Sequence, residues 1–292
     1  MTVFSEVVTK PVNSLFFYEV GIDKDKRFKK GESGVTRQKI MVDVSVLILA
    51  KNEERNIKEC IESCSFANEI LIIDDGSTDK TKEIAESLGA RVIHRNMNGD
   101  WGAQQTFAIQ QAKYPWIFFI DADERCTPEL GEEIAEAVKK NDKLAYWIKR
   151  KNKFRNNVAT HGSLRPDYVC RLMPAEGSYV EGEVHPAIIT PYKNAKLNGH
   201  MFRYIYYNWK QYMNKINKYT TLAAEKYKNQ GKKVSFTKDV VFRPLWGFFK
   251  EYIIDLGFLD GKIGWVFAVA HYYYTTMKYA KLYYLYKDNG KL

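Results

Sequence analysis

Four short apolar runs, separated by segments of helical periodicity, restrict the fold classes open to this chain. They are VSVLIL (44–49), EILII (69–73), ARVIH (90–94) and WIFFI (116–120). Apolar runs of this length that are rich in β-branched residues are typical of strands buried on both faces of a sheet. The intervening segments 52–67, 79–88 and 102–112 have helical spacing of apolar residues. This alternation predicts an α/β layer with a mostly parallel sheet.

The rest of the chain has a looser pattern. A proline opens a predicted helix over 128–139, and two further strands are expected over 144–149 and 168–173. Beyond about residue 200 the pattern is helical, with helices predicted over 208–229, 245–256 and 262–287.

Composition excludes several classes of protein. Of the 292 residues, 45% are hydrophobic and 27% are charged, which is ordinary for a globular chain and argues against disordered, collagen-like and coiled-coil structures. The four cysteines are too few for a disulfide scaffold and form no CxxC pair, which argues against a zinc ribbon. No apolar window reaches the roughly 18 residues of a membrane-spanning helix, so we expect a chain that does not cross a membrane.

Acidic residues follow three of the four apolar runs. Glu53 and Glu54 come after the first run, Asp74 and Asp75 follow the second, and Asp121, Asp123 and Glu124 follow the fourth. In open α/β sheets, ligands bind at the carboxyl ends of the strands. The sequence has no GxGxxG after the first run and no GxxxxGK[ST] motif, so the dinucleotide-binding and P-loop phosphate cradles are absent.

Carboxylates repel a phosphate, but they can hold one through a divalent cation, and Asp123 can serve as a hard oxygen ligand. They also accept hydrogen bonds from ribose hydroxyls and base N–H groups. The acidic edge therefore predicts a nucleoside diphosphate bridged by Mg²⁺ or Mn²⁺. A lone DxD can equally be a solvated turn or a helix cap, but its position after a buried strand, beside other acidic strand ends, favours the binding site.

Three motifs, LILAKNEERNI, IIDDGSTDKT and FFIDADE, closely resemble those of the inverting family 2 glycosyltransferases, which have the GT-A fold. The later segments HGSLRPDYVCRLM, EGEVHPAI, GFLDGKIGWVFA and YAKLYYLY are similar to the lipopolysaccharide-core branch, which includes the heptose β-1,4-glucosyltransferases. The resemblance covers residues 44 to 286. It implies an enzyme that moves a hexose from a UDP-sugar to a lipopolysaccharide-core or other lipid-linked glycan.

The resemblance also implies roles for individual residues. Ala50, Asn52 and Glu53 match the first loop, which contacts the nucleoside. The acid that accepts from uracil N3–H corresponds to Asp75, and the ribose-facing acid to Asp121.

Further positions concern the metal and the diphosphate. Asp123 matches the metal ligand, and His185 lies where several GT-A enzymes place a second protein ligand, although a single histidine can also be structural. Arg171 matches an arginine that faces the diphosphate or the acceptor, and a structural ion pair is an equal alternative.

An inverting transfer needs a base that deprotonates the acceptor hydroxyl. Asp167 is the candidate, because it follows the nucleotide half and matches the PDY motif of the family. Glu181 and Glu183 are rival candidates, and Asp167 can also be a turn residue after Pro166.

We expect three parts along the chain: an arm or leader of unassigned role over 1–40, a GT-A catalytic domain over 41–200, and a helical extension over 201–292. Within the catalytic domain, 41–125 is the expected nucleotide-sugar half and 126–200 the acceptor half.

The extension is basic and aromatic. From residue 193 onward there are 18 Lys and Arg against 6 Asp and Glu, with 14 of the 20 tyrosines. Tyrosine, tryptophan and lysine suit the surface of an anionic bilayer, which predicts a peripheral protein on the inner face of the cytoplasmic membrane. Alternatively, the aromatic residues pack on the catalytic domain and the lysines are its solvated face.

Two other functions fit parts of the pattern. A basic surface with many tyrosines is typical of nucleic-acid-binding proteins, but no RNP-like or helix-turn-helix signature accompanies it, so no nucleic-acid partner is expected. A sugar nucleotidyltransferase also uses acidic strand ends, but it needs a glycine-rich activating loop, and AKNEERN is not one.

Overall fold

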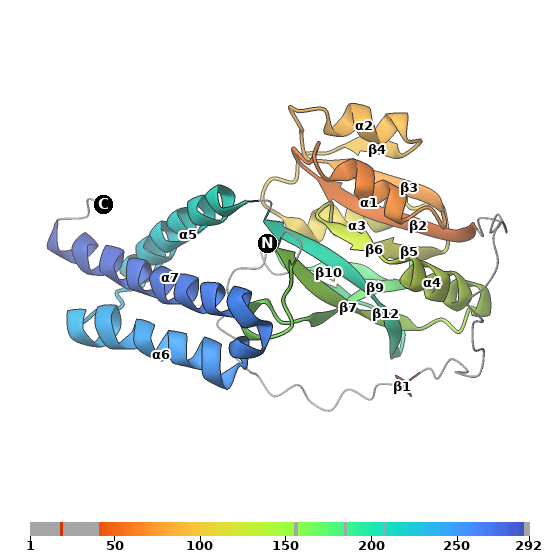
Figure 1. Ribbon diagram of the computed structural model, residues 1–292. Helices are drawn as coiled ribbons and strands as arrows, with labels where there is room; N and C mark the ends of the chain where they lie inside the picture. Colours follow the sequence, from red (N-terminus) through yellow and green to blue (C-terminus); the bar gives the residue numbers. More distant parts are fainter. Residues whose placement is uncertain (1–17, 20–40, 155–156, 184–185, 207, 289–292) are drawn as a thin grey trace. The chain divides into compact units, whose positions relative to one another are not determined.

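The computed structural model of the chain describes residues 18–19, 41–154, 157–183, 186–206 and 208–288 (Figure 1). The predicted metal ligand His185 and nearly all of the 1–40 arm lie outside these ranges.

Four parallel strands form the half of the sheet that comes first in the chain. They follow the order β4 (Arg91–His94), β3 (Ala67–Asp74), β2 (Val42–Ala50) and β5 (Trp116–Phe119). The connecting helices are α1 (Ile57–Ser63), α2 (Thr81–Ser87) and α3 (Trp101–Gln111). The predicted α/β layer with a mostly parallel sheet is confirmed here.

The sheet continues beyond β5 with antiparallel pairing. β9 (Asp167–Pro174) pairs with β5, and β7 (Ala145–Phe154) pairs with β9. β12 (Asn194–Tyr206) follows β7 and also pairs with the short β6 (Glu124–Cys126). Smaller elements complete the strands: β1 (Tyr18–Glu19) beside β12, β8 (Asn157–Val158) beside β7, and a separate hairpin of β10 (Tyr179–Glu181) and β11 (Ala187–Ile189).

Side chains on the two faces of the sheet form two apolar clusters. On one face, Val46 and Ile48 of β2 pack with α1 and with α4 (Pro128–Lys140). On the other face, Leu47 packs with Ile109 of α3. Because successive residues of a strand point to opposite faces, an uninterrupted apolar β2 supplies both clusters. Thr127 caps α4 by accepting from the Leu130 N–H, and Pro128 occupies the first turn.

The contacts divide the chain into two compact units. One contains the described residues up to Arg150 together with 167–203, and therefore most of the sheet. The other joins 151–166 to the chain from Tyr204 onward. The domain boundary expected at residue 200 stays a prediction.

The second unit is mainly helical, as expected. It contains η1 (Gly162–Leu164) and α5 (Trp209–Asn229), followed by a nearly continuous helical stretch of η2 (Phe236–Phe242), α6 (Arg243–Phe249) and η3 (Lys250–Ile254). A short turn, η4 (Gly257–Asp260), leads into α7 (Gly261–Lys287), which lies beside α6 (Figure 1). Among the described helices, none combines the length and the apolar character needed to cross a bilayer.

Candidate active site

The loops after β2 and β3 interlock at the carboxyl edge of the sheet. The pairing places Ala50 beside Asp74, so the two loops leave the sheet together. Asn52, at a positive φ of 55°, donates its N–H to Ser77 Oγ at 2.9 Å and accepts from the Thr78 N–H at 2.8 Å. Asparagine tolerates this left-handed conformation better than most residues. The KNEE segment is therefore a shaped loop, and helix α1 begins at Ile57 rather than at residue 52.

Asp75 is fixed at the centre of these loops. Its N–H donates to the Ala50 carbonyl at 2.9 Å, and its Oδ1 accepts from the Met97 N–H at 2.7 Å. Lys51 pairs with its Oδ2 at 3.0 Å. Although desolvation opposes it, these hydrogen bonds lower the pKa of Asp75 below its ordinary value. The structure thus places two predicted nucleoside contacts, Ala50 and Asp75, side by side with an ionised carboxylate.

Glu53 belongs to the loop after β2 and is held there by two hydrogen bonds. Its N–H donates to Thr81 Oγ1 at 2.7 Å, and its carboxylate accepts from Asn56 Nδ2 at 2.6 Å. Burial raises the pKa of Glu53 and the hydrogen bond from Asn56 lowers it, with burial the larger effect. The negative charge of Asp123 also raises this pKa.

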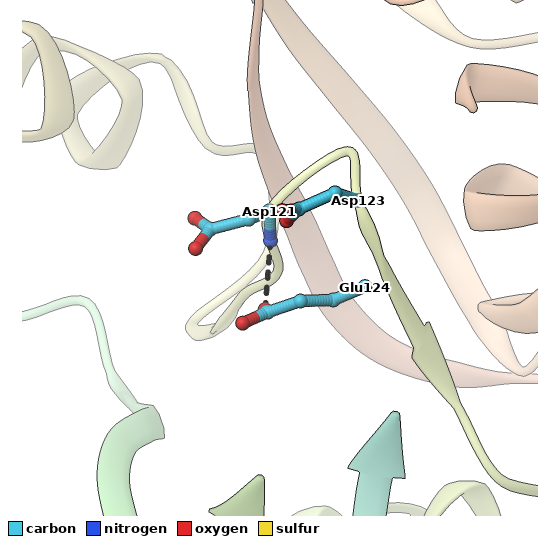
Figure 2. Close-up of side chains that lie close together, drawn as sticks. All are labelled: Asp121, Asp123 and Glu124. Atoms are coloured by element: carbon cyan, nitrogen blue, oxygen red, sulfur yellow. Dashed lines mark hydrogen bonds between the residues drawn. The ribbon is translucent and has the colours of Figure 1, made fainter. Parts of the chain in front are cut away.

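Asp121 and Asp123 lie in the tight turn between β5 and β6, and Glu124 is the first residue of β6. Their side chains extend to the same side of the turn (Figure 2). Each offers a carboxylate oxygen, and these oxygens lie within 4.8 Å of one another. The Asp121 N–H donates to Glu124 Oε2 at 3.0 Å, which closes the turn. The three acids after β5 therefore share one location.

Two arginines from neighbouring strands hold the acids. Arg171 of β9 donates to Asp121 Oδ2 at 2.8 Å and to both oxygens of Glu124 at 3.1 Å. Arg150 of β7 donates to Glu124 Oε1 at 3.1 Å. The Glu124 side chain is fully buried, so its charge is compensated by these two guanidinium groups rather than by water.

Two further residues, Arg203 and Asp167, join these acids and arginines. Arg203 of β12 donates from Nε to Asp123 Oδ2 at 3.3 Å. Arg150 also binds both carboxylate oxygens of Asp167, at 3.0 and 2.6 Å. We call Asp121, Asp123, Glu124, Asp167, Arg150, Arg171 and Arg203 the acid–arginine cluster. Its four carboxylates and three guanidinium groups leave one net negative charge.

The electrostatics keep Asp121 ionised. Partial burial would raise the pKa of Asp121, but the charge and hydrogen bonds of Arg171, with Arg203 and Arg150, lower it well below its ordinary value.

The oxygens of this cluster suit Mg²⁺ or Mn²⁺, which prefer hard oxygen ligands. The side chains of Asp121 and Asp123 are 42% and 27% exposed, whereas that of Glu124 is not exposed at all. Asp121 and Asp123 are therefore the residues that could hold a cation, and Glu124 anchors the arginines.

The cluster contains residues that were not among the predicted site residues. Arg150 and Arg203 come from strands whose alternation would have identified them. Arg150 is two residues after the buried Ile148, and Arg203 two after the buried Met201. A period of two places each arginine on the buried face, where a cation requires an acidic partner.

Two of the predicted bases lie elsewhere in the described structure. Glu181 ends β10 and is exposed, and Glu183 contributes its carbonyl to the Trp101 N–H at 3.0 Å. No hydrogen bond or ion pair within the described ranges joins either side chain to the acid–arginine cluster.

Comparisons with known proteins identify a family that the chain resembles. The family model of glycosyl transferase family 2 matches residues 45–209. The lipopolysaccharide core biosynthesis glycosyltransferase LpsC of Rhizobium meliloti is 30% identical over 249 residues, covering 82% of this chain and 92% of that protein. An uncharacterized glycosyltransferase of Rickettsia bellii is 31% identical over 253 residues, covering 82% of this chain and 85% of its own length.

A solved structure with some likeness is glucosyl-3-phosphoglycerate synthase of Mycobacterium tuberculosis, in complex with Mn²⁺, UDP and glucosyl-3-phosphoglycerate. The match has a TM-score of 0.31 at 25% identity and spans less than half of either protein, 39% of this chain and 44% of the synthase.

The family model covers more than half of the chain, and a relative of nearly the same extent shares 30% of its residues. The predicted GT-A sheet and the predicted glycosyltransferase class are both confirmed. The chain belongs to glycosyl transferase family 2.

Proposed function

We propose that this enzyme transfers a hexose from a UDP-sugar to a lipopolysaccharide-core or other lipid-linked glycan, with inversion at the sugar carbon and with a divalent cation. The observation that carries the proposal is the convergence of Asp121 and Asp123 with three nearly buried arginines beside the loops of the first half of the sheet. A site of this composition suits a ligand that carries both a cation and a diphosphate.

The donor nucleoside binds at the interlocked loops. Asp75 accepts from the uracil N3–H, which its ionised carboxylate supports. Ala50, Asn52 and Glu53 shape the wall of this pocket, and Asp121 accepts from the ribose. Fixed hydrogen bonds within the loops mean that little ordering is required when the nucleotide binds.

Asp123 would hold the divalent cation, which would supply positive charge against the leaving diphosphate when bound. Arg171 is the residue that binds the same diphosphate. Its Nε is buried and lacks a hydrogen-bond partner among the described residues. An unsatisfied buried donor is costly, and an oxygen of the donor sugar nucleotide would satisfy it.

Asp167 acts as the general base toward the acceptor hydroxyl. Its side chain is 45% exposed, and Arg150 fixes the orientation of the carboxylate. A carboxylate offers about four lone-pair positions, so two remain for the acceptor after the two bonds to Arg150. Proton transfer to Asp167 accompanies attack of the acceptor oxygen on the sugar carbon, from the face opposite the diphosphate.

The acceptor class is supported by the relative LpsC, whose name places it in lipopolysaccharide core biosynthesis. A lipid-linked acceptor is met at a bilayer surface, so we place the enzyme peripherally on the inner face of the cytoplasmic membrane.

The test is a donor screen in the presence of Mn²⁺, followed by transfer to isolated core oligosaccharide with analysis of the released nucleotide. Release of UDP with formation of an inverted glycosidic bond supports the proposal. Release of pyrophosphate would instead identify a sugar nucleotidyltransferase.

A further inference from the structure

The helical stretch from η2 to η3 exposes many of its large apolar residues. The residues concerned are 44% to 62% exposed and are spaced three or four apart, except for one adjacent pair: Phe242, Leu245, Trp246, Phe249 and Ile253. This spacing places them along one side of a helix. The turn that follows adds Leu256 and Leu259, at 44% and 56% exposure. We call these seven residues the apolar face.

Two acidic residues of the same stretch are buried. Asp239 and Glu251 are each only 6% exposed. Asp239 accepts from the Ser235 N–H and from Arg243, and Glu251 accepts from the Ser163 N–H. The stretch packs on α7, and a Cβ at Gly247 would approach His271 to 3.2 Å. The stretch therefore has buried contacts on α7 and leaves its larger apolar side chains in water, although apolar residues of a helix usually face the core.

The apolar face is too extensive to be an ordinary set of scattered surface residues. Single exposed apolar residues are normal, but contiguous exposed patches mark sites of contact with proteins, ligands or membranes. Trp265 of α7 adds a further half-exposed ring, which lies 5.3 Å from the rings of both Phe248 and Tyr252.

In this part of the chain most acidic side chains are buried, whereas several lysines are exposed. The side chains of Asp239, Asp255 and Asp260 are 9%, 19% and 5% exposed, and each binds a group of its own unit. Between residues 231 and 288 only Asp288 is an exposed acid, whereas the exposed lysines are Lys233, Lys238, Lys250, Lys262 and Lys287. The surface charge of this region is therefore positive.

We infer that the apolar face is the surface by which this protein inserts into the headgroup region of an anionic phospholipid bilayer. Large apolar side chains enter the boundary between headgroups and acyl chains, and lysines pair with anionic lipids. Pairing with a second copy would bring two positive surfaces together, whereas an anionic bilayer neutralises them. The inference deepens the proposed function, since it rests on a lipid-linked acceptor, but vesicle binding requires neither donor nor acceptor.

The experiment is sedimentation of the full chain with vesicles of phosphatidylcholine containing phosphatidylglycerol, and with vesicles of phosphatidylcholine alone. A variant combining Leu245→Ser, Trp246→Ser and Phe249→Ser should lose binding by at least about tenfold, because three large apolar side chains no longer leave water. The matched control combines Met213→Ser and Leu222→Ser on α5, at 42% and 48% exposure, and should bind like the wild type.

A second variant tests the charge. Lys233→Glu, Lys238→Glu and Lys262→Glu together should reduce binding to the anionic vesicles toward the level seen with phosphatidylcholine alone. Circular dichroism establishes that each variant is folded, which exposed positions should permit.

Three results would overturn the inference. The first is that the wild-type chain does not bind anionic vesicles, and the second is that the α5 control loses as much binding as the triple serine variant. The third is a dimer in sedimentation equilibrium that the triple serine variant abolishes, while neither form binds vesicles. Transfer to lipid-free core oligosaccharide reports separately on the proposed function and should be unchanged in the triple serine variant.

Discussion

Arg150 and Asp167 face each other across paired strands, and the guanidinium binds both carboxylate oxygens, at 3.0 and 2.6 Å. The same guanidinium reaches the buried Glu124 at 3.1 Å. The proposed base is thus tied to the acids that follow β5 through a single side chain. This arrangement orients Asp167 and gives each partner a role that mutation can separate.

Replacement of Asp167 by asparagine should lower kcat by about a hundredfold or more, because asparagine cannot accept the proton of the acceptor hydroxyl. UDP affinity in Mn²⁺ should stay close to the wild-type value, since the nucleoside loops are untouched. Steady-state kinetics with Glu181→Gln and Glu183→Gln as controls check this prediction. A large loss of kcat in either control, with Asp167→Asn active, would move the base to the β10–β11 hairpin.

Arg171→Met should destabilise the protein by about 3 kcal/mol, because the change leaves the fully buried Glu124 short of a counter-charge. Lys82→Met is the control, since Lys82 and Glu86 form an exposed pair at 3.8 Å that should contribute less than about 1 kcal/mol. Urea unfolding followed by circular dichroism gives both values. Equal effects of the two substitutions would show that burial of the cluster adds nothing.

Asp260 fixes the loop that begins the HGSL segment. It accepts from the N–H groups of Thr160 and His161, from Thr160 Oγ1 at 2.5 Å, and from His161 Nδ1 at 3.1 Å. Burial opposes ionisation, but these hydrogen bonds lower the pKa of Asp260. Asp260→Asn should therefore cost about 2 kcal/mol of unfolding free energy at neutral pH.

The pH dependence of this stability difference follows from the direction of the Asp260 pKa shift. Because the folded pKa lies below the unfolded one, the contribution is complete above the ordinary aspartate value, and it decreases as pH falls through the lower folded value. Urea midpoints of wild type and Asp260→Asn should differ equally at about pH 7 and pH 5, and converge below about pH 4. A difference that grows on acidification would contradict this account.

Substitution of Gly162, which lies in the same loop, should lower the free energy of unfolding. It has a φ of +63°, and a Cβ there would come within 2.6 Å of Glu251 Oε1. Gly162→Ala should destabilise by about 1 to 3 kcal/mol through backbone strain and displacement of Glu251. Gly231→Ala provides a comparison, because it shares a positive φ but meets nothing within 4 Å, so the two unfolding free energies separate contact from strain. Equal losses would assign the whole effect to the backbone.

The first half of the sheet could be predicted because β2, β3 and β5 each contain an apolar run, and β4, although half-exposed, follows a helix in the same alternation. β12 was missed, since its buried positions alternate with polar ones and include Gly199, where a Cβ would come within 2.8 Å of Leu130 Cα. A glycine placed for close packing weakens the apolar pattern of a strand. The first helix was predicted too early, because the N–H groups of residues 52–54 donate to the loop after β3 and to Thr81 at the start of α2.

The acids of the site could also be predicted, since they directly follow an apolar strand. Arg171 was among the predicted site residues, and the alternation of β7 and β12 marks Arg150 and Arg203 as buried. Which acids these arginines bind depends on antiparallel pairing between distant segments, which periodicity does not reveal. In the helical extension, the expectation that aromatic residues lie at a surface holds for some residues only. Phe267 and Tyr279 of α7 are buried, whereas Trp246 and Phe249 of α6 and Trp265 of α7 are exposed.

The binding of UDP in the presence of Mn²⁺ to wild type and Asp123→Asn, measured by calorimetry alongside sugar transfer, tests the metal–diphosphate site most directly. Asp142→Asn, an exposed acid paired with Lys140 at 2.6 Å, is the matched control. We predict that Asp123→Asn loses both UDP–Mn²⁺ binding and transfer while the control keeps both. Wild-type binding and turnover in Asp123→Asn would contradict the account.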